Sequence, residues 1–263
     1  MIPLTREQMA WRAAQDLMEG DYVNLGIGIP TLAASYVPLG REVIFHSENG
    51  ILGMGPKPEP GKEDPYMVDA GKNKTTLVAG GCFVHHADAF LMIRGGHLDV
   101  SLLGAFEVSE KGDLANWTTE DPAFPPGVGG AMDLAVGAKA IRVIMEHTSK
   151  NGEPRILKAC TYPLTAAGCV KRIYTNLAVI EVTPQGLFVI EMVPGMPLEK
   201  LQTLTEPKLQ LASNWQALAP PEAPEARYRR GFRPCDFAQK SHALAPGTRS
   251  LHGEYPRGLE LAV

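Results

Sequence analysis

Short apolar runs alternate with helical segments along most of the chain, and this alternation constrains the fold more than any other feature. The runs within residues 75–81, 97–105 and 140–147 have the length and the β-branched content of strands. Helical segments lie between several such runs, near residues 86–94 and 131–139. Strands that alternate with helices build a largely parallel sheet. We therefore predict an α/β fold with helices on both faces of the sheet and antiparallel additions near the C-terminus.

The composition changes after about residue 213. The last fifty residues are rich in Pro, Ala, Arg and Gly and carry no sustained periodicity, which is typical of a poorly ordered extension. We therefore expect a folded domain over residues 1–213 and an extension over residues 214–263. The alternative is an extension that packs on a partner.

Charge and cysteine usage exclude several classes of function. A net charge of −4 and a pI near 6.0 argue against nucleic acid or an anionic membrane as the main partner. No signal peptide or apolar run of about 18 residues is recognisable. The cysteines are too widely spaced for a zinc site or a disulfide framework; they are Cys82, Cys160, Cys169 and Cys235. We expect a cytoplasmic protein with free thiols.

An acidic residue stands where a buried strand ends. The strand end predicted at residues 42–45 is followed by Glu48, and Asn49, Gly53 and Gly55 then belong to a glycine-rich loop. In an open α/β sheet, strand ends of this kind line the binding crevice. The residues alone leave three interpretations of Glu48: a surface residue, an acceptor that organises the loop, or an acid/base or nucleophilic carboxylate.

Two other glycine segments have a simple interpretation beside a functional one. Residues 24–31 carry Thr31 where a dinucleotide-binding loop needs its third glycine, so we favour a turn that shapes the crevice over NAD binding. Gly129 and Gly130 precede the helix predicted at residues 131–139. Their amides either face an oxyanion or belong to a plain loop.

His85, His86 and Asp88 form a polar group at the start of another predicted helix. Adjacent residues do not usually chelate one metal ion together, and no further ligand follows at helical spacing, so we expect no metal. The open alternatives are a pocket lining for an acidic substrate and a solvated helix start.

Several longer segments share a pattern with one known family. In order over roughly residues 5–205 they are "HSENGILGMGP", "VDAGKNK", "MIRGGHLDVSLLGAFEVS", "GDLANW", "GVGGAMDLAVGAK" and "CTYPLT". Together they resemble the β subunit of the 3-oxoacid CoA-transferases. The chain departs from the family pattern at "VDAGK", where Ile-Asn is commoner before Ala-Gly-Lys, and in its extension. The resemblance implies the α/β fold that this family shares with ribose-5-phosphate isomerase.

The resemblance also implies roles for the candidate residues. The family's covalent nucleophile is the glutamate of Ser-Glu-Asn-Gly, which is Glu48 here, and it carries CoA as a glutamyl-CoA thioester in ping-pong chemistry. No cofactor or metal is implied, because CoA arrives on the substrate. Gly129 and Gly130 are candidate oxyanion donors. The other candidate substrate-binding residues are Asn49, Gly53, Gly55, His85, His86 and Arg94.

Within the family, "FVHHADAF" and "GCVKRIYT" resemble the enzymes that transfer CoA from succinyl-CoA to 3-oxoadipate, in the β-ketoadipate pathway of aromatic degradation. Family members complete their site with a separate α subunit, so we expect a heterodimer or heterotetramer. An acetoacetate-specific subunit and an acyl-CoA hydrolase on the same fold are the alternatives. A non-catalytic ligand sensor is a third, which the Ser-Glu-Asn-Gly motif disfavours.

Overall fold

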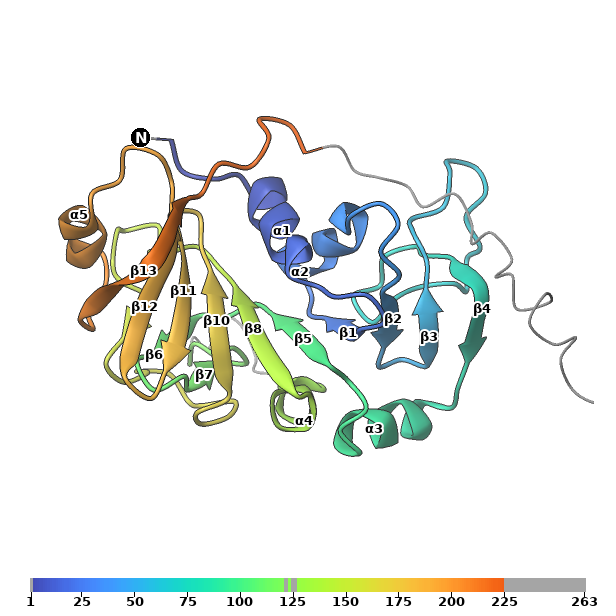
Figure 1. The fold of residues 1–263 in the computed structure, drawn as a ribbon. Helices are drawn as coiled ribbons and strands as arrows, with labels where there is room; N and C mark the ends of the chain where they lie inside the picture. Colours follow the sequence, from blue (N-terminus) through green and yellow to red (C-terminus); the bar gives the residue numbers. More distant parts are fainter. Residues whose placement is uncertain (1, 121–122, 124–126, 225–263) are drawn as a thin grey trace, which may run out of the picture. The chain divides into compact units, whose positions relative to one another are not determined.

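The computed structural model describes residues 2–120, 123 and 127–224. Its main feature is a 10-stranded sheet (Figure 1). In sheet order the strands are β13 (Leu209–Ala217), β12 (Gly186–Met192), β11 (Ala178–Thr183), β10 (Val170–Tyr174), β8 (Ala140–Ile144), β5 (Val100–Leu103), β1 (Tyr22–Leu25), β2 (Ile44–Ser47), β3 (Ile51–Met54) and β4 (Leu77–Phe83).

The centre of this sheet is parallel and its flanks are largely antiparallel. Strands β10, β8, β5, β1 and β2 all run in one direction. Antiparallel β3 and β4 extend one edge, antiparallel β11 and β12 extend the other, and β13 pairs in parallel with β12. The predicted α/β fold is confirmed.

Helices cover both faces of the sheet, as predicted (Figure 1). On one face lie α1 (Arg6–Gln15), α2 (Ile29–Leu32) and a 3₁₀ turn (Ala33–Tyr36), and on the other lie α3 (His86–Arg94) and α4 (Ala131–Gly137). A short helix, α5 (Leu198–Thr203), precedes β13. Helix α3 packs closely on α4. At Gly137 there is no room for a side chain, since a Cβ there would come 2.3 Å from the carbonyl oxygen of Ile93.

Helix α1 is anchored to the sheet through partly buried charges. Arg12 Nε donates to Glu191 Oε2 at 2.7 Å, and the hydroxyl of Tyr174 donates to Asp16 Oδ2 at 2.6 Å. Burial alone would raise the pKa of Asp16, but Arg12, Tyr174 and Arg172 together hold it below its ordinary value. These charges are paired, which is what their burial requires.

A second sheet has three strands, β7 (Leu114–Ala115), β6 (Glu107–Ser109) and β9 (Ile156–Leu157). Its buried carboxylate, Glu107, accepts from the backbone amide and the hydroxyl of Thr161, both at 2.6 Å, and from the amide of Tyr162 at 3.1 Å. Since an unpaired buried carboxylate would be costly, the "CTYPLT" segment has a structural task here.

Two sequence predictions need correction. Residues 51–54, expected as part of a glycine-rich loop, form strand β3. The expected domain boundary at residue 213 falls inside β13, and Leu218 beyond it is buried. The part of the expected extension from residue 225 onward lies outside the described residues. Within the described ranges, no helix is long and apolar enough to cross a membrane.

Candidate active site

The candidate site lies where the order of the parallel strands changes direction. Strand β1 pairs with β2 on one side and with β5 on the other, so the chain winds outward both ways from β1. Ligands of open α/β sheets bind outside the carboxyl ends of the strands at such a switch point. Glu48 directly follows the carboxyl end of β2.

Glu48 lies in the tight turn that joins β2 to β3. Ser47 pairs with Ile51 across this hairpin, and the amide of Gly50 donates to the carbonyl of Ser47 at 3.0 Å. Gly50 has a φ of 112°, and a Cβ there would come 2.4 Å from the carbonyl oxygen of Val84. Only glycine fits this position, and it completes the turn that presents Glu48.

The side chain of Glu48 contacts two other elements. Its Oε2 accepts a hydrogen bond from Asn24 Nδ2, on β1, at 3.0 Å. A Cβ built on Gly130 would lie 3.8 Å from Glu48 Cγ and 3.1 Å from the ring of Phe90. The structure therefore brings together Glu48 and Gly130, whose neighbour is Gly129, although Gly130 lies 82 positions after Glu48 in the sequence.

The two adjacent histidines have different positions. His86 Nδ1 lies 2.8 Å from the carbonyl oxygen of Glu48, and its ring packs edge-on against Phe90 with centroids 4.9 Å apart. His85 instead caps α3, because its Nδ1 accepts from the amide of Ala87 at 3.2 Å. Of these two histidines, His86 is therefore the one placed against Glu48.

Arg94 lies at the end of α3 and is 61% exposed. Its Nε donates to Asp133 Oδ1, on α4, at 2.7 Å, and its guanidinium lies 5.5 Å from the centroid of the Phe90 ring. Asp133 thus fixes the orientation of Arg94 beside the ring that also touches His86 and Gly130.

The remaining candidates have structural partners within the chain. Asn49 Nδ2 donates to the carbonyl of Val68 at 2.7 Å, which attaches the "VDAGKNK" segment to the turn. A Cβ on Gly53 would come 2.8 Å from Gly81 Cα, and a Cβ on Gly55 would come 2.4 Å from Thr76 Oγ1. These glycines permit the close approach of neighbouring backbone. Their role in substrate binding stays a prediction.

Sequence reasoning missed Asn24 and His46. His46 is buried next to Asn24; burial lowers the pKa of its imidazole, and the Glu48 carboxylate opposes that shift. The sequence did carry a signal, because polar Asn24 interrupts the apolar run of β1. A buried polar group needs a partner, and here the partner is the candidate nucleophile.

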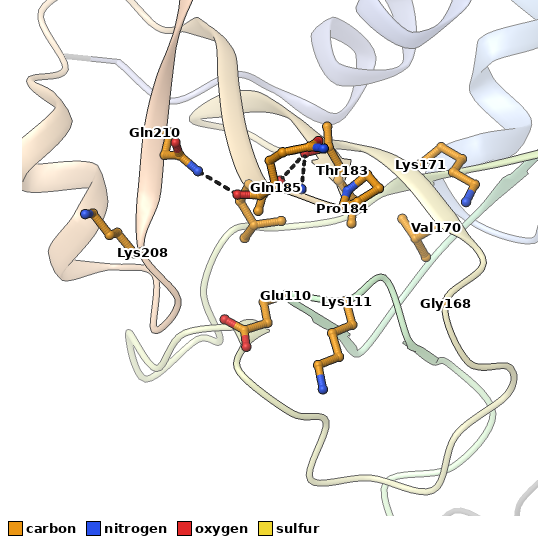
Figure 2. A pocket seen from close by; sticks show the side chains of 13 residues that line it. Glu110, Lys111, Gly168, Val170, Lys171, Thr183, Pro184, Gln185, Lys208 and Gln210 are labelled. Carbon is orange, nitrogen blue, oxygen red and sulfur yellow. Dashed lines mark hydrogen bonds between the residues drawn. The ribbon is translucent and has the colours of Figure 1, made fainter.

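A separate surface pocket of about 610 Å³ lies at the opposite end of the parallel strands, beside the start of β10. Figure 2 shows Glu110 and Lys111 on one side of it and the β11–β12 turn on the other. It does not include Glu48 or its neighbours. No group of three side chains suited to a metal ion is found in the described part of the chain.

Comparison with known proteins identifies the class. The chain belongs to the coenzyme A transferase family, whose model matches residues 6–203. It is 57% identical over 202 residues to the B subunit of 3-oxoadipate CoA-transferase from Acinetobacter baylyi, covering 77% of this chain and 93% of that protein. It is 46% identical over 206 residues to the B subunit of succinyl-CoA:3-ketoacid coenzyme A transferase from Helicobacter pylori, covering 78% of this chain and 99% of that protein. The chain is therefore a CoA-transferase chain.

Solved structures agree in fold. An acyl-CoA transferase of Escherichia coli O157:H7 matches with a TM-score of 0.63 at 20% identity, covering 81% of this chain but only 43% of that longer one. Glutaconate coenzyme A-transferase of Acidaminococcus fermentans matches with a TM-score of 0.61 at 17% identity, covering 84% of this chain and 91% of that chain. Both similarities concern the fold alone.

Proposed function

We propose that this chain is the β subunit of a two-subunit enzyme that transfers CoA from succinyl-CoA to 3-oxoadipate. The observation that carries the proposal is the Glu48 carboxylate, held by Asn24 on a tight turn at the carboxyl ends of the parallel strands. The 3-oxoadipate CoA-transferase relatives, at 57% identity, support the choice of substrate over the succinyl-CoA:3-ketoacid relatives at 46%.

The chemistry uses Glu48 as a covalent carrier. Its carboxylate attacks the thioester carbonyl of succinyl-CoA and expels CoA thiolate, which leaves a mixed anhydride. The thiolate then attacks the glutamyl carbonyl, which releases succinate and leaves a glutamyl-CoA thioester. The carboxylate of 3-oxoadipate reverses both steps, so that 3-oxoadipyl-CoA leaves and Glu48 is regenerated. The thioester bond energy is kept throughout, and no cofactor beyond the CoA on the substrate takes part.

Each step develops negative charge on a carbonyl oxygen. The proposed donors to this oxygen are the backbone amides of Gly130, whose Cβ position lies 3.8 Å from Glu48 Cγ, and of the adjacent Gly129. One such preorganised donor typically lowers the barrier by about 3 kcal/mol.

A partner is proposed to close the site against water, because hydrolysis of the glutamyl thioester would waste the activation. The relatives are named as B subunits, which suggests that a different subunit accompanies them. Large apolar side chains are exposed on the elements around Glu48: Ile27 is 71%, Leu91 62% and Val136 78% exposed. An obligate subunit interface typically buries such surface, above about 2,000 Å² in total.

The second carboxylate of 3-oxoadipate needs a cationic or hydrogen-bonding partner that acetoacetate does not require. Arg94 is our first candidate, because it is exposed and oriented by Asp133 beside Phe90. His86 is the second, through the ring nitrogen that does not face Glu48.

The test uses the complex with the corresponding α subunit. After incubation with succinyl-CoA, borohydride should reduce the glutamyl thioester to an alcohol, detected by mass on the peptide that contains Glu48. Glu48→Gln should fold and show neither the label nor transfer. Higher kcat/KM with acetoacetate would reassign the acceptor, and CoA release without any acceptor acid would indicate a hydrolase. A label on another residue would refute Glu48 as nucleophile.

A further inference from the structure

Three polar side chains lie side by side in the buried centre of the sheet. Asn24 on β1 is directly opposite His46 on β2 and Ser101 on β5, so all three point to the same face. Asn24 and Ser101 are 0% exposed and His46 is 1% exposed. Buried polar groups in the middle of an otherwise apolar sheet destabilise the fold unless their hydrogen bonds compensate.

The contacts of Asn24 determine how these groups are oriented. Its Nδ2 lies 3.0 Å from Glu48 Oε2, 3.2 Å from the carbonyl oxygen of His46 and 3.3 Å from His46 Nδ1. A carboxylate and a carbonyl only accept hydrogen bonds, so the amide nitrogen, not the amide oxygen, must face them. The amide has two hydrogens for these three contacts, so the hydrogen that does not face Glu48 is shared between the carbonyl oxygen and Nδ1 of His46. Nδ1 therefore accepts, and the ring is neutral with its proton on Nε2, a buried atom without a hydrogen-bond partner among the described residues.

We propose that His46 is a positioning residue for CoA transfer, which acts by fixing the Asn24 amide that holds Glu48 Oε2. This inference depends on the proposed nucleophilic role of Glu48. The glutamate side chain has three rotatable bonds, and ordering them costs entropy in the step that leads to attack. With Oε2 held, the direction in which the other oxygen attacks the thioester is set before the substrate arrives.

Two substitutions separate the ring nitrogens of His46. In His46→Asn the side-chain oxygen takes the place of Nδ1, so the acceptor for Asn24 is kept. In His46→Gln the side chain reaches the place of Nε2 instead and leaves Asn24 without that acceptor. We expect His46→Gln and His46→Leu to lower kcat about tenfold with KM unchanged, whereas His46→Asn stays within about threefold of wild type.

Ser101→Ala is the matched control. Ser101 is equally buried, lies beside Asn24 on the same face, and has no hydrogen-bond partner for its hydroxyl among the described residues. Loss of an unpaired hydroxyl should leave kcat unchanged. If Ser101→Ala lowers kcat as much as His46→Leu, general packing explains the effect and the proposal fails.

A double-mutant cycle in the complex with the α subunit gives the decisive result. If His46 acts through Asn24, His46→Leu should lower kcat less than about twofold in an Asn24→Ala background. Independent, multiplying effects would overturn the proposal, as would a fully active His46→Leu. Borohydride trapping of the wild-type complex is run in parallel. If no label appears on Glu48, the proposed function fails; if the label forms and the His46 variants match wild type, only the positioning role fails.

Discussion

His86 Nδ1 lies 2.8 Å from the carbonyl oxygen of Glu48. Because a carbonyl oxygen only accepts, His86 donates this hydrogen bond. The contact joins the first turn of α3 to the hairpin turn that carries the candidate nucleophile. Since the ring also packs on Phe90, which touches Gly130, one imidazole connects three parts of the site. Backbone support of Glu48 is thus a role for His86 that differs from the substrate-binding role expected from the sequence.

His86→Ala distinguishes these two roles. If His86 supports the Glu48 turn, kcat should fall about tenfold while KM for 3-oxoadipate stays unchanged. A higher KM for 3-oxoadipate at constant kcat would instead assign His86 to the second carboxylate. His85→Ala is the control: it removes the N-cap of α3, so we expect a loss of about 1 kcal/mol in stability with kcat retained.

The turn of Glu48 should be intolerant of any side chain at Gly50. Gly50→Ala must place its Cβ 2.4 Å from the Val84 carbonyl oxygen while the backbone keeps a φ of 112°. We expect a loss above about 2 kcal/mol in the free energy of unfolding, together with loss of transfer. Gly61→Ala is the matched control for backbone strain without a clash. Gly61 also has a positive φ, of 82°, but a Cβ there would meet no atom within 4 Å. That variant should lose only about 1 kcal/mol and keep its activity. Equal losses for the two variants would show that backbone strain alone, not the clash, sets the cost.

The fold was predictable because periodicity is a local property. The parallel centre follows from apolar runs that alternate with helices, and α3 spans the residues expected for it. Strands β10 and β13 were not predicted. In β10, Lys171 and Arg172 interrupt the apolar pattern. Arg172 is compatible with partial burial through ion pairs with Glu181 on β11 and with Asp16, which is 156 residues away in sequence. Such distant pairing leaves no trace in a local pattern.

The candidate site was predictable only in part, for a related reason. Glu48 and Gly130 were identified from turns and glycines, but their proximity depends on how α4 packs against α3. His46 and Asn24 were not identified, since a polar residue in a strand has no assignable partner until the register is known. The substrate contact expected of Gly53 and Gly55 stays a prediction; their close neighbours within the chain are visible only in the packed structure.

Stability should depend on pH through His147. Burial lowers the pKa of this imidazole to about 4 from its ordinary 6.5, and the ring lies between the hydroxyls of Thr175 and Thr205 at 3.0 and 2.8 Å. The unfolded chain takes up a proton near pH 6.5, which the folded chain resists until about pH 4. The contribution of neutral His147 to the free energy of unfolding is therefore fully present above pH 6.5. It is lost as the pH falls toward 4, by about 3 kcal/mol in all.

His147→Gln checks this assignment. The variant lacks the titrating ring, so its melting temperature should fall less than that of wild type between pH 7 and pH 5. Its stability at pH 7 should itself be lower, because both threonine contacts are altered. If wild type and variant lose the same amount over this range, His147 is not the origin of the pH dependence.

Two truncations test where the folded domain ends. Ending the chain after Ala212 removes the second half of β13, including the pairing of Gln216 with Glu191. It also deletes Leu218, which is 2% exposed and whose amide donates to the Met192 carbonyl at 2.7 Å. Burial of one leucine is worth about 2 to 3 kcal/mol, so we expect a melting temperature roughly 5 to 10 °C lower.

Ending the chain after Pro224 keeps these contacts and also the hydrogen bond from Gln8 Nε2 to the Pro221 carbonyl at 3.1 Å. We propose that residues 225–263 are dispensable for catalysis. The chain that ends at Pro224 should therefore keep the full melting temperature and turnover. A loss in the longer version would assign a structural or partner-binding role to those residues, and an unchanged shorter version would show that the end of β13 contributes nothing to stability.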